Sequence, residues 1–149
     1  MVLWVAAGVV LPTWAATAQA QMALSAAINV SGSFRALSQR MAKAYCQQHL
    51  QVMPLAALDV LAKVRKQAQA GAADLAKGST AGAWPADLSR QLEEVQKQYT
   101  VLNTLTATAP SKASAAAVAE QADRMMTAAQ TATESLEKLA RARSAKLVD

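Results

Sequence analysis

The stretch "VAEQADRMMTAAQTATESLEKLARAR", residues 118–143, decides the fold, because its apolar residues recur alternately every four and three positions. This spacing places them on one side of an α-helix and is typical of the seam of a helical bundle. We therefore expect a long amphipathic helix in the last third of the chain. Its seam consists of Val118, Ala122, Met125, Ala129, Ala132, Leu136 and Leu139, and Arg143 interrupts it near the end.

Three earlier segments show the same periodicity, and prolines at positions 54, 85 and 110 separate the four segments from one another. The sequence therefore predicts an all-α fold, an antiparallel up-down-up-down four-helix bundle whose first and last helices are the longest. The expected core residues are Val30, Phe34, Leu37, Met41 and Ala44 in the first helix, Leu61, Val64, Ala68, Gly71 and Leu75 in the second, and Leu88, Leu92, Val95, Tyr99 and Leu102 in the third.

The first twenty of the 149 residues, "MVLWVAAGVVLPTWAATAQA", form an uncharged apolar run that ends in the small-x-small pattern of a signal peptidase site. We expect a signal peptide over 1–20, one domain over 21–149 and a location in the periplasm. The run lacks a basic n-region, so an uncleaved anchor in the inner membrane is the alternative. No later run is long and apolar enough to span a bilayer, so we expect a separate membrane receptor or kinase to read the state of the bundle.

The net charge of +5 favours anionic partners. Nucleic acid is not expected, because the basic residues are scattered without interleaved aromatics and an exported chain rarely meets it. Cys46 and His49 lie one helical turn apart, but no second pair completes a metal site. The sequence offers neither a nucleophile with a base nor paired carboxylates, so we predict no cofactor, no metal and no enzymatic activity.

The stretch "INVSGSFRALSQRMAKAY", residues 28–45, holds Arg35, Arg40 and Lys43 and no carboxylate. Besides its core stripe it carries a second stripe with Arg35 at the centre, which predicts a dimer or partner face. A two-fold axis would bring two Arg35 side chains together, and an anion between them would relieve their repulsion. The apolar residues expected in this face are Leu24, Ile28, Ala42 and Tyr45, and the expected additional hydrogen-bond donors to the anion are Ser31 and Ser38.

One further residue supports this hypothesis, and one alternative stands against it. Gly32, one turn before Arg35, is unfavourable inside a helix unless something approaches the backbone closely. Alternatively, Arg35 pairs with a carboxylate from another helix, and the candidates for that pairing are Glu93, Glu94, Glu120 and Asp123.

The same stretch resembles the N-terminal sensor domain shared by type IV pili methyl-accepting chemotaxis transducers (PilJ-like) and nitrate/nitrite-sensing histidine kinases (NarX/NarQ-like). The resemblance rests on Asn29, Gly32, Arg35 and Arg40, and "LSQRMAKAY" at 37–45 is closest to the pilus-transducer version. In the nitrate-sensing branch the resemblance implies a periplasmic four-helix bundle that dimerises, with one arginine from each first helix holding a single nitrate or nitrite at the interface.

By position that arginine is Arg35, with Gly32 and Ser33 in the preceding turn. The resemblance thus implies a small-anion sensor. It supports a ligand-binding role for Arg40 less strongly than for Arg35. The alternative is a structural or adapter bundle that docks a partner protein through the face of its first helix, with a carboxylate of the partner on Arg35.

Overall fold

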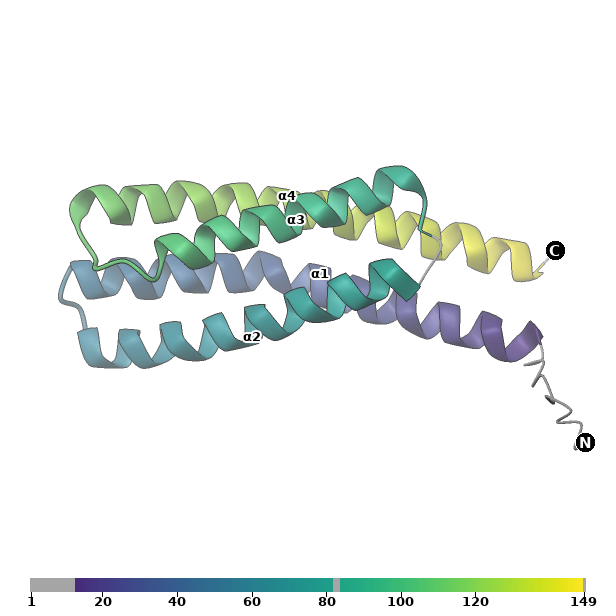
Figure 1. Cartoon of the computed structure of the whole chain (residues 1–149), viewed down its shortest axis with the longest axis horizontal. Helices are drawn as coiled ribbons and strands as arrows, with labels where there is room; N and C mark the ends of the chain where they lie inside the picture. Colours follow the sequence, from purple (N-terminus) through teal and green to yellow (C-terminus); the bar gives the residue numbers. More distant parts are fainter. Residues whose placement is uncertain (1–12, 82–83, 149) are drawn as a thin grey trace, which may run out of the picture.

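The computed structural model describes residues 13–81 and 84–148, and this part of the chain consists of four α-helices joined by short connections (Figure 1). The helices are α1 (Thr13–His49), α2 (Pro54–Ala81), α3 (Ala86–Leu105) and α4 (Lys112–Val148). The predicted all-α fold is confirmed. The connections alternate between the two ends of the molecule in Figure 1, which is consistent with the predicted up-down-up-down topology.

The prolines limit the helices as predicted. Pro54 is the first residue of α2, where its missing N–H costs nothing, and Pro85 directly precedes α3. Helices α1 and α4 have 37 residues each, against 28 in α2 and 20 in α3, so the first and last helices are indeed the longest. As a result, α1 and α4 continue side by side beyond the shorter pair (Figure 1).

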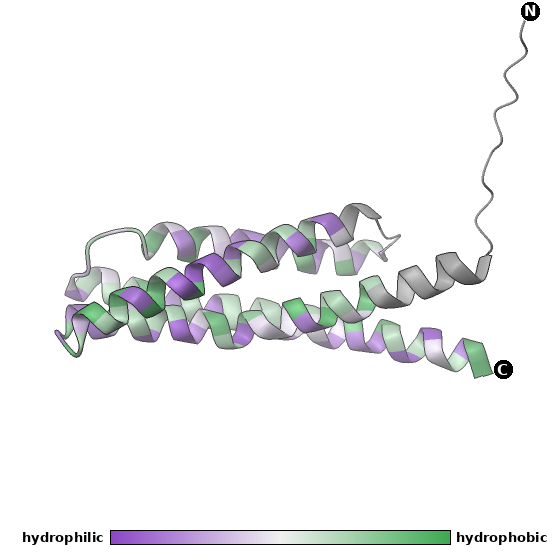
Figure 2. Ribbon diagram, turned by 90° about the horizontal axis from the view of Figure 1, so that it is seen from below, coloured by the Kyte–Doolittle hydropathy of each residue, from purple (hydrophilic) through white to green (hydrophobic). Residues whose placement is uncertain are grey.

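The core follows the four predicted seams. Every residue predicted for the α3 seam is buried, and so is the α4 seam from Val118 to Leu136. Hydrophobic and polar residues alternate along each ribbon in Figure 2, as expected for amphipathic helices that share one core. Phe34 of α1 and Tyr99 of α3 meet in the middle of this core, with 6.0 Å between their ring centroids.

The packing is uneven around the bundle. Helix α1 lies against both α2 and α4, and α3 lies against α4, whereas α2 and α3 touch each other much less. Two polar bridges span this looser seam: Arg65 Nε donates to Asn103 Oδ1 at 2.9 Å, and Gln96 Nε2 donates to the Ala72 carbonyl at 2.6 Å. Helix α1 therefore has the most extensive contacts with the rest of the bundle.

Two predictions concern the ends of the chain. Most of the expected signal peptide, residues 1–12, lies outside the described residues, and α1 already begins at Thr13. None of the helices in the described ranges combines the length and hydropathy that a membrane crossing requires.

Candidate functional site

The predicted partner face of α1 lies largely inside the single chain. Leu24, Ala42 and Tyr45 are buried in the core, and Ile28 is half-buried against it. The reason is geometric: a helix in a four-helix bundle touches two neighbours, so it carries two apolar stripes, and here the second stripe meets α4. These four residues are therefore not a free surface for a second subunit, and the prediction is corrected on this point.

Ser31 and Ser38, predicted as anion donors, are also fully buried. Ser31 Oγ donates to the Ala129 carbonyl at 3.3 Å and accepts from Thr133 Oγ1 at 3.0 Å, which links α1 to α4. Ser38 Oγ donates to the Arg35 carbonyl at 2.9 Å. Buried hydroxyls need such hydrogen-bond partners. Both serine hydroxyls are therefore engaged inside the bundle and cannot reach a ligand at the surface.

Tyr45 stabilises the end of the bundle where α3 connects to α4. Its ring is buried, and its hydroxyl lies 3.0 Å from the Thr108 carbonyl, 3.2 Å from the Ala109 carbonyl and 2.9 Å from Ser114 Oγ. These groups belong to the connection between α3 and α4 and to the first turn of α4. Tyr45 therefore fixes the α3–α4 connection on the end of α1 and has a structural role.

Arg35 lies at the edge of the α1–α4 contact with its side chain exposed. Its Nε donates to the Gly32 carbonyl at 3.3 Å, and its Nη1 donates to Gln130 Oε1 at 2.5 Å. The amide of Gln130 in turn donates to Glu134 Oε1. Within the described chain Arg35 forms no ion pair, and both of its protein partners are neutral oxygens.

Three of the four carboxylates considered as partners for Arg35 are engaged elsewhere. Glu120 pairs with Arg124, Glu94 lies 3.9 Å from Lys97 Nζ, and Asp123 accepts a hydrogen bond from Gln39 at 3.0 Å. The sequence analysis expected a carboxylate as the partner of Arg35 and missed the neutral amide of Gln130. No motif or spacing in the sequence indicates that Gln130 lies beside Arg35.

Gly32 lies directly beside the Arg35 guanidinium. A Cβ added at Gly32 would be 3.7 Å from Arg35 Nη2 and 3.9 Å from Thr133 Cγ2, which are ordinary contacts. The packing of the single chain therefore does not require glycine here. Gly71 is different, because its added Cβ would lie only 3.2 Å from Val30 Cγ1 in the α1–α2 contact.

The other polar residues of the stretch face outward. Ser33 is exposed and donates to the Val30 carbonyl of its own helix at 2.7 Å. Arg40 and Lys43 are also exposed, and neither forms an ion pair with any residue that the structure describes. The exposed side of α1 is therefore basic, with three cations that no carboxylate of the described chain neutralises.

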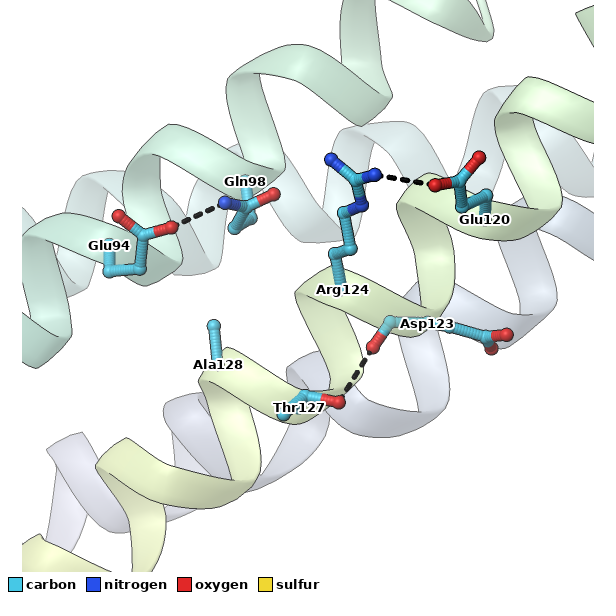
Figure 3. Close-up of a pocket in the computed structure, with 7 residues that line it drawn as sticks. All are labelled: Glu94, Gln98, Glu120, Asp123, Arg124, Thr127 and Ala128. Carbon is cyan, nitrogen blue, oxygen red and sulfur yellow. Dashed lines mark hydrogen bonds and ion pairs between the residues drawn. The ribbon is translucent and has the colours of Figure 1, made fainter.

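An open hollow lies between α3 and α4 (Figure 3). It encloses about 490 Å³ and is lined by Glu94, Gln98, Glu120, Asp123, Arg124, Thr127 and Ala128. Its polar groups bind one another: Arg124 pairs with Glu120, Gln98 donates to Glu94, and Thr127 Oγ1 donates to the Asp123 carbonyl at 3.0 Å (Figure 3). Because Arg124 is paired inside this hollow, the hollow is a weaker candidate for an anion than the cations on the exposed side of α1, which form no ion pair in the described chain.

The described residues contain no group of three His, Cys, Asp or Glu side chains that could hold a metal ion. Cys46 is a half-buried free thiol whose Sγ lies 3.9 Å from the Ala115 carbonyl.

Comparison with known proteins gives one family. No curated protein and no solved structure matches this chain. The profile of the family described as "PilJ: Type IV pili methyl-accepting chemotaxis transducer N-term" matches residues 16–125, which include α1, α2, α3 and the first part of α4. The chain therefore belongs to the PilJ family, the N-terminal helical sensory module of type IV pili methyl-accepting chemotaxis transducers.

Proposed function

We propose that this chain is a sensor-like module that binds a small oxyanion, nitrate or nitrite first, between the Arg35 side chains of two protomers. The observation that carries the proposal is the state of Arg35: an exposed guanidinium, oriented by two neutral oxygens, without an ion pair in the described chain. Guanidinium is planar and binds planar oxyanions through paired N–H···O bonds. Its Nη2, beside Gly32, is the nitrogen without a protein acceptor among the described residues.

The two-fold contact would use the exposed side of α1, because α4 covers the side that the sequence predicted. We define the outer α1 face as Ser25, Asn29, Gly32, Ala36 and Lys43, of which only Gly32 is partly covered. These positions follow the spacing by fours and threes of a coiled-coil seam, with Gln39 completing the series. Ser25, Gly32 and Ala36 are small, so a second α1 can approach closely, and the long Arg35 side chain would reach from the edge of this face toward the two-fold axis.

Bringing two cationic helices together is unfavourable without an anion. Each protomer would contribute Arg35 near the axis, and two guanidinium groups in a desolvated contact repel each other. One bound oxyanion neutralises part of this charge and accepts hydrogen bonds from both sides. The anion would therefore bind the dimer more tightly than the monomer. By thermodynamic linkage, anion binding would favour dimerisation and dimerisation would favour anion binding.

Location and partners follow from the same hypothesis. Residues 1–20 would direct export, which places the bundle in the periplasm, and a membrane receptor or kinase would read whether the dimer holds its anion. An uncleaved 1–20 segment would tether the bundle to the inner membrane and leave the chemistry unchanged. N-terminal sequencing of the exported protein distinguishes the two: a new terminus at position 21 indicates cleavage, and the original terminus indicates an anchor.

The test of the function is calorimetric titration with nitrate, nitrite and chloride on the natural protein and two variants. Arg35→Ala should abolish the binding heat. Arg40→Ala is the matched control, because Arg40 is an equally exposed and unpaired cation on the same helix, and it should leave the isotherm nearly unchanged. An isotherm unaffected by Arg35→Ala, or no heat from a folded natural protein, would contradict the proposal and favour an adapter in which a partner carboxylate binds Arg35.

A further inference from the structure

The connection between α1 and α2 exposes an unusual amount of apolar surface. It lies at the end of the bundle away from the start of α1 and the end of α4 (Figure 1). We define the apolar tip as five side chains with exposed fractions between 48% and 83%: Leu50, Val52, Met53, Leu55 and Leu58. Soluble proteins rarely gather this many large apolar groups at one place unless the surface binds something.

The backbone of the tip is strained in a way that glycine would relieve. Helix α1 ends in a Schellman motif, in which the Val52 N–H donates to the Gln47 carbonyl at 2.9 Å and the Gln51 N–H donates to the Gln48 carbonyl at 3.2 Å. Gln51 at its C′ position has a φ of 55°, and Met53 has a φ of 45°. Glycine is the usual residue at such angles. The chain retains larger residues there and exposes most of Met53.

The tip rests on an ordered base. The hydroxyl of Tyr45, one turn before the end of α1, holds the neighbouring α3–α4 connection through its bonds to Thr108 and Ser114. On the other side, Ala57 of α2 is buried and its N–H donates to the Met53 carbonyl at 2.9 Å. The exposed side chains therefore project from a backbone held on both sides, so little ordering is needed when they bind.

The charge pattern indicates what covers the tip. Residues 44–58 contain no Asp, Glu, Lys or Arg, although the whole chain carries +5. The next two charged residues, Asp59 and Lys63, neutralise each other at 2.7 Å. A two-fold contact places the same patch of both copies face to face, so a patch of one charge sign repels its copy and a neutral apolar patch does not. The tip is thus suited to meeting a second tip.

A bilayer fits the tip less well. Segments that insert at membrane interfaces combine Trp or Phe with Lys or Arg, which contact the headgroups. The exposed residues of the tip include neither an aromatic nor a cation.

We propose that the apolar tip is a self-association surface, on which a second copy of this chain packs its own tip end to end. Five such side chains offer on the order of 500 Å² per copy, below the ~800 Å² per partner of stable interfaces, so the contact should be weak and depend on concentration. The tip is about 22 Å along α1 from Arg35, because fifteen residues separate position 35 from position 50 at ~1.5 Å each. End-to-end contact would therefore connect bundles without involving the outer α1 face.

Sedimentation velocity of the full chain across a broad concentration range tests this proposal. The natural protein should increase in mean mass with concentration, and the double variant Met53→Gln, Leu55→Gln should weaken that association at least tenfold. The matched control is Val101→Gln with Met126→Gln, which alters two exposed apolar residues elsewhere. Circular dichroism verifies folding of each variant. A natural protein of constant mass, or equal weakening by the control, would overturn the proposal.

A cross-linking experiment identifies the surface directly. In a Cys46→Ser background, Met53→Cys treated with a short bis-maleimide should give a covalent dimer, and Val101→Cys should not. Equal yields from both positions would overturn the proposal. So would tip-dependent binding to phosphatidylethanolamine and phosphatidylglycerol vesicles without self-association. Arg35→Ala should leave the cross-link intact, so a failure of anion binding and a failure of the tip contact can be distinguished.

Discussion

The substitution Gly32→Ala separates the needs of the fold from the needs of the Arg35 site. Alanine is about 1 kcal/mol more favourable than glycine inside a helix. The added methyl would meet only ordinary contacts, 3.7 Å from Arg35 Nη2 and 3.9 Å from Thr133 Cγ2, so no clash offsets this gain. We therefore expect Gly32→Ala to raise the free energy of unfolding by about 1 kcal/mol, a rise in melting temperature of about 3 °C.

The same methyl should weaken anion binding, because it would project from the outer α1 face where the second protomer approaches. Urea unfolding measures the stability, and calorimetry with nitrate measures the binding. Gly71→Ala is the control: its methyl would lie 3.2 Å from Val30 Cγ1, so overpacking of roughly 1–3 kcal/mol should cancel or exceed the propensity gain. If Gly32→Ala destabilises the protein as Gly71→Ala does, the glycine serves packing and the reasoning about its position is refuted.

Three further substitutions test individual contacts. Gln51→Gly should stabilise the protein by about 1 kcal/mol in urea unfolding, because it relieves a φ of 55°; a loss of stability would contradict the Schellman assignment. Tyr45→Phe should cost about 1–2 kcal/mol and speed hydrogen exchange in the α3–α4 connection, and unchanged exchange would show that the hydroxyl does not hold it. Burial raises the pKa of Tyr99 above its ordinary value, against a smaller lowering effect of Arg65. The unfolded chain therefore loses this proton first, and stability should fall above about pH 10 as pH rises toward the folded pKa. Tyr99→Phe should reduce that slope in chemical unfolding at several pH values, and an identical slope would contradict it.

The helices could be predicted from the sequence because their signals are local. Prolines at 54, 85 and 110 limit elements whose apolar residues repeat with the helical period, and both signals depend only on residues close in the chain. The seam from Val118 to Leu136 accordingly became the buried side of α4.

The surroundings of Arg35 could not be predicted in the same way. Periodicity indicates that α1 has two apolar stripes, but it does not say whether the second stripe meets α4 or another subunit. The buried pair of Ser31 and Thr133 joins residues 102 positions apart, and Arg35 meets Gln130 at a separation of 95 positions. Such contacts depend on the register of α1 against α4, which side-chain packing sets and no short motif encodes.

The most direct test of the central claim is the number of anions bound per chain. Calorimetry of the natural protein with nitrate and nitrite, at concentrations where sedimentation shows a dimer, should give one anion per two chains. This stoichiometry follows if two Arg35 side chains share a ligand on a two-fold axis. One anion per chain, or none bound by a folded dimer, would contradict a shared Arg35 site.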